Sequence, residues 1–121
     1  MENKKIKSVE DFVVYQKAIK LFDDFIEKDL PLLRRNFAGE SLAKNQLRCL
    51  DSICANMEEG YDRKSGKEVI NFFRISKGST AEARGRYTRF KNILSKEVIN
   101  QRVQVLSEIR AMLESLIAKW K

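Results

Sequence analysis

Apolar side chains recur every three or four positions in four separate stretches of the chain, which is the spacing of amphipathic helices. The first stretch predicts a helix that begins at a capping box of Ser8 and Asp11 and ends at Leu30, because Pro31 disfavours helical geometry in the residue before it. Residues 31–39 show no clear period and are interpreted as a connector. The apolar positions of this helix are Phe12, Tyr15, Ala18, Ile19, Phe22, Phe25 and Ile26.

The second and third stretches meet at a tight basic corner. A second helix is predicted over residues 40–61, with Gly60 as its stop signal. Ser65 and Glu68 have the spacing of a second capping box, and a third helix is predicted over residues 67–93. Its core side is small at mid-length and aromatic at its ends: Val69, Phe72, Phe73, Ser76, Ser79, Thr80, Ala83, Tyr87, Phe90 and Leu94. Gly78 and Gly85 each cost about 1 kcal/mol of helix propensity relative to alanine, which a close approach of another helix or of a partner would explain.

The fourth stretch reaches the C-terminus and has the most regular heptad. Asn92 is predicted to end the third helix in the left-handed conformation and Ser95 to cap the fourth, so the two helices should be antiparallel. The main apolar row is Ile99, Leu106, Leu113 and Trp120 with Ile109 and Leu116 between them, and Arg102 is its one exception. A second row of Val98, Val105 and Met112 makes the apolar face of this helix wider than one helix–helix seam needs. This width predicts contacts with further subunits.

Composition supports one all-α domain over residues 1–121. One Pro and five Gly among 121 residues leave long stretches free of helix breakers, and no strand pattern of alternating β-branched residues is present. The sequence therefore predicts an up-down antiparallel four-helix bundle with a loose arm at residues 1–7. Cys49 and Cys54 are too far apart along one helix to pair, which is typical of reduced core cysteines, and no apolar leader or membrane span is evident, so a cytoplasmic location is predicted.

Positive charge is concentrated in the third helix. The chain has 24 Lys and Arg against 17 Asp and Glu, a net charge of +7. On a helical wheel, five cations fall within about 120° of one another: Lys67, Arg74, Lys77, Arg84 and Lys91. This stripe, with Arg63 and Lys64 at the corner and Arg34 and Arg35 in the connector, suits a phosphate backbone, although a merely solvated face weighs about equally. Aromatic residues placed for base stacking are few, so contacts to phosphate and shape are expected rather than sequence readout.

Catalytic and metal-binding patterns are not evident. The sequence contains no His, which removes the commonest general base and metal ligand, and residues 60–66 do not form a phosphate-binding glycine loop. Glu58 and Asp62 could hold a cation, but pairing with nearby Arg and Lys is the favoured interpretation. We predict no enzyme activity, no cofactor and no metal.

Several segments resemble one known family over nearly the whole chain. They are Glu10 to Ala18, Ser52 to Tyr61, Arg63 to Ser65, Phe72 with Phe73, and Gly78 to Glu82. They are similar to the small bacterial four-helix bundle proteins named after the intervening sequences of 23S ribosomal RNA genes, to which the accessory variability determinant of diversity-generating retroelements is related. The resemblance implies a ring-like homopentamer with a basic surface, and nucleic-acid binding or partnership with a reverse transcriptase in the retroelement branch. The matching motif residues, taken as mainly structural, are Asn56, Glu59, Gly60, Arg63, Ser65, Gly78, Ser79 and Glu82.

Two functions follow as hypotheses. The leading one is an oligomeric module that binds structured RNA, or RNA and DNA, through the phosphate backbone with little sequence specificity. The alternative is a scaffold whose basic face docks an acidic protein or a reverse transcriptase. Steep salt dependence of RNA affinity would favour the first.

Overall fold

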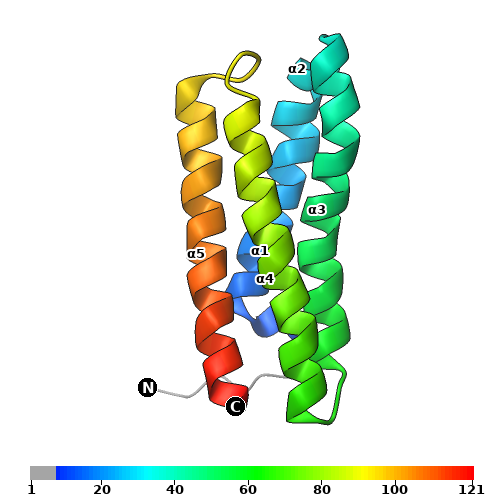
Figure 1. Cartoon of the computed structure of the whole chain (residues 1–121), viewed down its shortest axis with the longest axis vertical. Helices are drawn as coiled ribbons and strands as arrows, with labels where there is room; N and C mark the ends of the chain where they lie inside the picture. The colour runs from blue at the N-terminus through cyan, green and yellow to red at the C-terminus, as the bar shows by residue number, and fades with distance from the viewer. Residues whose placement is uncertain (1–7) are drawn as a thin grey trace.

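The structure, a computed structural model, describes residues 8–121, and the predicted loose arm at residues 1–7 lies outside the described residues. Four helical arms run alternately up and down beside one another (Figure 1). The first arm consists of α1 (Val13–Asp24), the π-helix η2 (Phe25–Asp29) and α2 (Leu30–Leu33). The other arms are α3 (Phe37–Tyr61), α4 (Gly66–Arg89) and α5 (Lys96–Trp120), and residues 8–121 contain no strand. The prediction of an all-α chain with four helices is confirmed.

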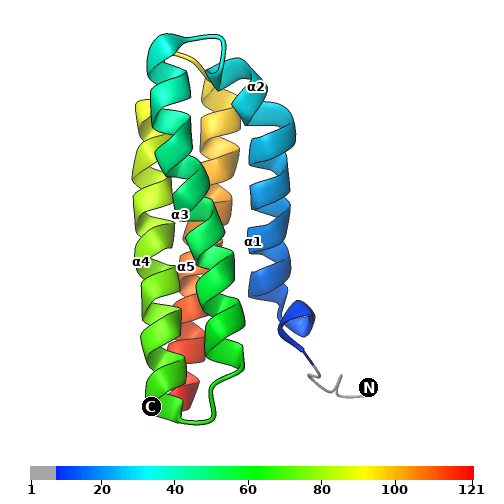
Figure 2. The same cartoon turned by 90° about the vertical axis from the view of Figure 1, so that its right-hand side faces the viewer.

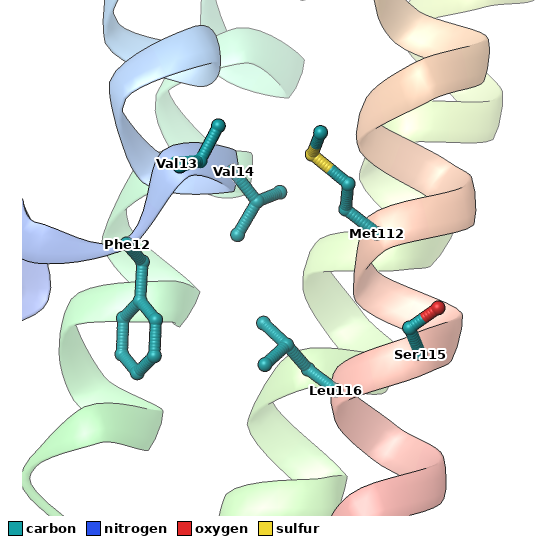
Figure 3. Close-up of a pocket in the computed structure, with 6 residues that line it drawn as sticks. All are labelled: Phe12, Val13, Val14, Met112, Ser115 and Leu116. Carbon is teal, nitrogen blue, oxygen red and sulfur yellow. The ribbon is translucent and has the colours of Figure 1, made fainter. Parts of the chain in front are cut away.

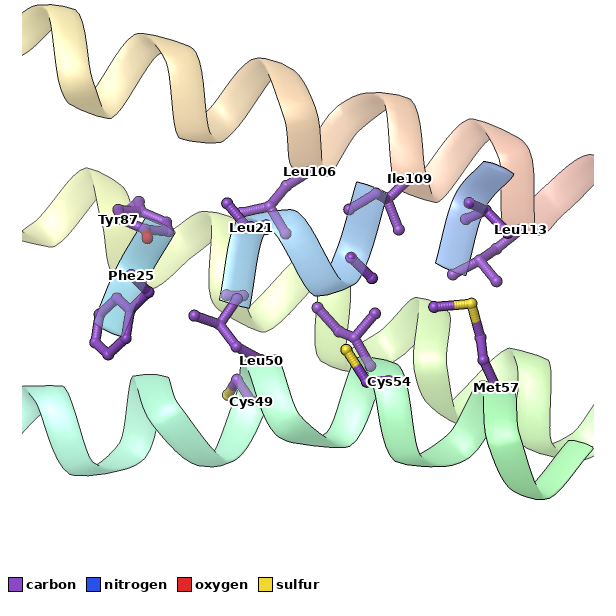
Figure 4. Close-up of a cluster of buried hydrophobic side chains, with 14 of the residues drawn as sticks. Leu21, Phe25, Cys49, Leu50, Cys54, Met57, Tyr87, Leu106, Ile109 and Leu113 are labelled. Atoms are coloured by element: carbon purple, nitrogen blue, oxygen red, sulfur yellow. The ribbon is translucent and has the colours of Figure 1, made fainter. Parts of the chain in front are cut away.

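The core lies along the axis between the four arms. In one view α4 stands beside α3 and α5, and α1 closes the bundle on the far side (Figure 2). The interior side chains interdigitate from all four arms (Figure 4), including Leu21, Leu50, Met57, Leu106 and Leu113, each at most 2 % exposed. Burying one such side chain contributes about 1.5–3 kcal/mol, so the helical stripes of the sequence account for the assembly of the bundle.

The first arm does not end before Pro31, contrary to the prediction. Leu30 has helical angles of φ −56° and ψ −44°, and its N–H bonds to the carbonyl of Phe25, five residues back. In a regular α-helix the ring of Pro31 would clash with the preceding turn. The wider π turn makes room for the ring, and the chain stays helical to Leu33.

The start of the first arm also differs in detail. The backbone N–H of Ser8 donates to Asp11 Oδ2 at 3.1 Å, as a capping box requires. This cap begins only a 3₁₀ turn, η1 (Val9–Asp11), because Phe12 is extended, with ψ 128°. The α-helix therefore begins only at Val13, the residue after Phe12.

The predicted end of the second helix at Tyr61 is confirmed, but Gly60 is the penultimate residue of α3 rather than a stop signal beyond it. Gly60 is buried, and a Cβ added there would come within 2.8 Å of the Phe73 ring carbon Cε1. The absence of a side chain thus allows α3 and α4 to approach each other. At its other end α3 begins at Phe37, earlier than predicted, because the Asn36 side chain accepts the N–H of Gly39 at 3.0 Å.

Two of the predicted caps of the later helices are wrong and one is confirmed. Ser65 precedes α4 but its side chain makes no capping hydrogen bond. The α-helix ends at Arg89 rather than near Ile93, and no residue from 8 to 121 has a positive φ, so Asn92 is not a left-handed cap. Ser95 does cap α5, accepting the N–H of Val98 at 3.2 Å.

Two residues of the second apolar row of α5, Val105 and Met112, face α1 of the same chain. Met112 and Leu116 line one side of an apolar groove of about 240 Å³ whose other side is Phe12, Val13 and Val14 (Figure 3). The row therefore does not by itself require a second subunit, which corrects that part of the sequence argument. The groove itself stays open, and the Val13 side chain in it is 58 % exposed.

Candidate nucleic-acid interface

The basic stripe lies on the side of α4 that adjoins α5. Lys77 Nζ is 3.7 Å from Glu114 Oε1, and Arg84 Nη1 donates to Ser107 Oγ at 3.3 Å. Because both partners belong to α5, these contacts place the middle of the stripe where the two helices meet. Lys67 and Arg74 belong to the same helix, whereas Lys91 lies in the turn that follows it.

Four of the five stripe cations are exposed: Lys67, Arg74, Arg84 and Lys91. Within residues 8–121 none of these four forms an ion pair with a carboxylate. Exposed cations without a fixed counter-ion attract anions from solution, and the arrangement is suited to phosphate contacts.

Glu114 interrupts the stripe at mid-length. Its Oε1 atom is 3.7 Å from Lys77 Nζ and 3.5 Å from Arg110 Nε on its own helix. The carboxylate neutralises part of the charge that these two cations would offer to a phosphate. Sequence reasoning missed Glu114, although the predicted antiparallel packing of the third and fourth helices contains the signal, because it places α5 charges beside those of α4.

The corner cations differ from each other. Arg63 Nη2 donates to Glu59 Oε2 at 2.9 Å, and the guanidinium lies 4.8 Å from the centre of the Phe72 ring. Lys64 is exposed and forms no ion pair with residues 8–121. Arg63 is therefore held against the corner, whereas Lys64 is free to meet a ligand.

The motif residues at the α3–α4 seam form a polar network. Asn56 Nδ2 donates to the carbonyl and to Oγ of Ser52, at 2.8 and 3.0 Å, and Ser52 Oγ is 2.8 Å from Ser79 Oγ on α4. One turn inward, Ser76 Oγ donates to the Ile53 carbonyl at 2.7 Å. These two hydrogen bonds between the helices, Ser52 to Ser79 and Ser76 to Ile53, set the position of α4 along α3. They therefore also set the position of the stripe.

The carboxylates of the motif region are engaged separately. Tyr15 donates to Glu58 Oε2 at 2.8 Å, and burial together with this carboxylate raises the pKa of Tyr15. Glu82 Oε2 lies 3.5 Å from Cys49 Sγ, on the outer edge of the same seam. Residues 8–121 contain no group of three or more potential metal ligands.

Gly78 and Gly85 of α4 are not approached closely by another helix within residues 8–121. A Cβ at Gly78 would meet nothing within 4 Å, and one at Gly85 would meet only Arg89 Nη1, at 3.6 Å. The core residues of this helix are the predicted ones, but the close approach expected at Gly78 does not occur within the chain. Its face is open.

Comparison with protein families decides the relationship. The family model described as 23S rRNA-intervening sequence protein matches residues 10–115. The chain belongs to this family. The match includes the first three arms, α5 up to residue 115 and the whole stripe, so the basic flank lies within the family domain.

Searches of the curated proteins and of the solved structures return no significant match. None of the helices within residues 8–121 combines the length and apolar character needed to cross a membrane.

Proposed function

We propose that the protein is a non-catalytic, oligomeric nucleic-acid-binding protein that contacts the phosphate backbone through the stripe and reads little sequence. The observation that carries this proposal is the set of four exposed cations along α4 and the turn after it, none of which has a carboxylate partner in the described residues. Structured RNA is the favoured ligand, in keeping with the family to which the chain belongs.

The length of the stripe suits a double helix. At 1.5 Å per residue, Lys67 and Arg84 are separated by about 26 Å along the axis of α4, and Lys91 lies in the turn just beyond its end. One turn of duplex DNA is about 34–36 Å long, so cations spread along this flank can meet phosphates on one side of a duplex over most of a turn. Contacts of this kind position a duplex without identifying its bases.

Self-association would multiply the stripe. The family resemblance implies a ring-like homopentamer, and both the open face at Gly78 and the open groove between α1 and α5 provide surface for a neighbouring subunit. Each subunit would present the same cations, and binding would gain avidity. A solution mass of one 14.1 kDa chain at micromolar concentration would contradict this part of the proposal.

A second candidate function is docking of an acidic protein, a reverse transcriptase included. It is favoured by Glu114, because one carboxylate already contacts both Lys77 and Arg110 on this flank. An acidic helix could supply similar carboxylates along the rest of the stripe.

Charge reversal tests the leading proposal. Arg74→Glu with Arg84→Glu should weaken binding to RNA and DNA of every sequence by a similar factor, with the melting temperature nearly unchanged, because both side chains are exposed. The matched control reverses two exposed cations of α3, Lys44→Glu with Arg48→Glu, and should bind far more like the parent. If the α4 variant binds as well as the parent at 150 mM salt, the stripe is only a solvated face and the docking function takes its place.

A further inference from the structure

Phe37 is the most exposed large apolar residue of the described chain. Its side chain belongs to the first residue of α3 and is 89 % exposed, whereas the other exposed large apolar residues range from 38 % to 58 %. Scattered apolar residues on a surface are normal, but a phenyl ring left almost wholly in water forgoes about 1.5–3 kcal/mol of burial. Nothing in the bundle requires an aromatic side chain at this position.

The backbone under Phe37 is well fixed. The Asn36 carbonyl accepts the N–H of Glu40 at 2.8 Å, and the Asn36 side chain accepts that of Gly39 at 3.0 Å. The chain on either side of Phe37 is thus tied into the start of α3. A ring on a fixed helix end loses little conformational freedom when a ligand stacks on it.

Exposed cations surround this end of the bundle. A Cβ at Gly39 would lie 3.0 Å from Ile93 Cδ1, so the start of α3 contacts the turn between α4 and α5. Figure 2 shows that turn and the one between α2 and α3 at the same end. The two turns and their flanks carry four exposed cations, Arg34, Arg35, Lys91 and Lys96, and two exposed carboxylates, Glu40 and Glu97.

These cations have no fixed partner. Within residues 8–121 no ion pair involves Arg34, Arg35 or Lys91. Lys91 is also the last cation of the stripe, so the positive flank of α4 continues into the end that carries Phe37. A nucleic acid lying along the stripe would reach this end without crossing a neutral gap.

We propose that Phe37 is a stacking platform for an unpaired base of single-stranded RNA, with Arg34, Arg35 and Lys91 contacting the adjacent phosphates. The proposal rests on the nucleic-acid binding proposed above and specifies its ligand: a single-stranded end or loop adjoining a helical segment. Aromatic stacking accepts every base because each has a π face, and single-stranded regions are where proteins reach unstacked bases in RNA.

Charge favours this occupant over a second copy of the chain. Each end carries four exposed cations against the two carboxylates Glu40 and Glu97, so two identical ends placed face to face would bring together two surfaces of net positive charge, which repel. A strand of RNA instead supplies a phosphate with every base, next to the ring on which the base stacks.

The test compares one sequence in two forms, a 20-nucleotide uridine-rich RNA and the duplex made with its complement. Phe37→Ala should weaken binding to the single strand roughly 5- to 150-fold and should leave duplex affinity nearly unchanged. This range corresponds to the 1–3 kcal/mol that is typical of one base stacked on an aromatic side chain. Phe37→Trp should retain the affinity, and in a Trp120→Phe background its fluorescence should be quenched by the single strand. Ile26→Ala, which truncates another exposed apolar side chain, is the matched control and should bind both forms like the parent.

Each other result overturns the inference in a recognisable way. If the parent binds both forms and Phe37→Ala binds the single strand equally well, the stacking site is wrong while the phosphate-binding stripe stands. If the parent binds neither form, the proposed function fails with it. Loss of oligomer mass in Phe37→Ala would assign the ring to a subunit contact, and loss of binding to anionic vesicles with unchanged RNA affinity would assign it to a lipid surface.

Discussion

Asp29, the last residue of the π-helix, and Arg102, the seventh residue of α5, form an ion pair with two hydrogen bonds inside the bundle. Arg102 Nε donates to Asp29 Oδ2 at 2.9 Å and Nη2 donates to Oδ1 at 3.0 Å. The residues are 1 % and 7 % exposed, and the Tyr87 hydroxyl donates to the same carboxylate at 2.7 Å. One buried carboxylate therefore joins the first arm, α4 and α5.

Removing one member of this pair should be more damaging than removing both. Arg102→Met leaves Asp29 buried with only Tyr87 as partner, and the free energy of unfolding should fall by about 3–5 kcal/mol. The double variant Asp29→Leu with Arg102→Met should recover part of that loss, because no buried charge is left and only the Tyr87 hydroxyl lacks its acceptor. Urea denaturation of the parent, both single variants and the double variant measures the coupling.

A surface pair provides the control for that cycle. Lys20 Nζ is 3.0 Å from Asp24 Oδ2 with the Lys20 side chain 74 % exposed, so Lys20→Met should cost less than about 1 kcal/mol. An Arg102→Met effect as small as this would show that the buried pair does not hold the arms together.

Two glycines should respond to alanine in opposite directions. At Gly60 the new Cβ would press on the buried Phe73 ring, so Gly60→Ala should lower the melting temperature. At Gly78 the space is open, and Gly78→Ala should stabilise the helix by up to about 1 kcal/mol. Thermal unfolding by circular dichroism gives both values, and light scattering on the same samples adds a second reading. If Gly78→Ala lowers the oligomer mass, the open face is a subunit contact.

Glu114→Gln should strengthen nucleic-acid binding. The substitution removes the carboxylate shared by Lys77 and Arg110 and leaves both cations able to meet phosphates. We expect duplex affinity to rise several-fold and the salt slope to steepen by about 1, the contribution of roughly one added phosphate contact. Fluorescence anisotropy titrations at several salt concentrations would show it. Unchanged or weaker binding would mean that the ligand does not follow this flank.

The Cys54 thiol makes stability depend on alkaline pH. Burial raises its pKa to about 12, whereas an unfolded cysteine has a pKa of about 8.5. Its contribution is fully present below pH 8.5 and is lost as pH rises toward 12, because only the unfolded chain then releases the proton; the slope approaches about 1.4 kcal/mol per pH unit. Urea denaturation between pH 8 and 11 should show a shallower decline for Cys54→Ala than for the parent, and parallel curves would contradict the assignment.

Helix positions could be predicted because their apolar spacing is decided locally. The stripes of α3 and α5 gave the buried residues Leu50, Ile53, Leu106 and Leu113, since 3.6-residue periodicity depends only on neighbours along the chain. The end of the first arm could not be predicted. Whether Pro31 breaks the helix depends on the π turn that begins at Phe25. The last residue of that turn is Asp29, which pairs with Arg102, 73 residues away in the sequence.

The candidate site was predictable only in part. The wheel angles of the stripe cations follow from helix geometry, and four of the five belong to α4, whereas Lys91 lies in the turn after it because the helix ends earlier than predicted. Their partners depend on the neighbouring helix α5: Glu114 forms an ion pair with Lys77, and Ser107 accepts a hydrogen bond from Arg84. Exposure of Phe37 was equally out of reach, because an apolar residue in a connector is ordinarily assigned to the core.

The salt dependence of duplex RNA binding tests the central claim most directly. Affinity should be measured from 50 to 300 mM KCl for the parent and for Arg74→Glu with Arg84→Glu. If the stripe of one subunit neutralises about five phosphates, log K should fall against log[salt] with a slope of roughly −4, steeper if several subunits engage one RNA and shallower by about 2 per subunit in the variant. A parent slope near zero, or equal slopes for the two proteins, would contradict phosphate binding by the stripe.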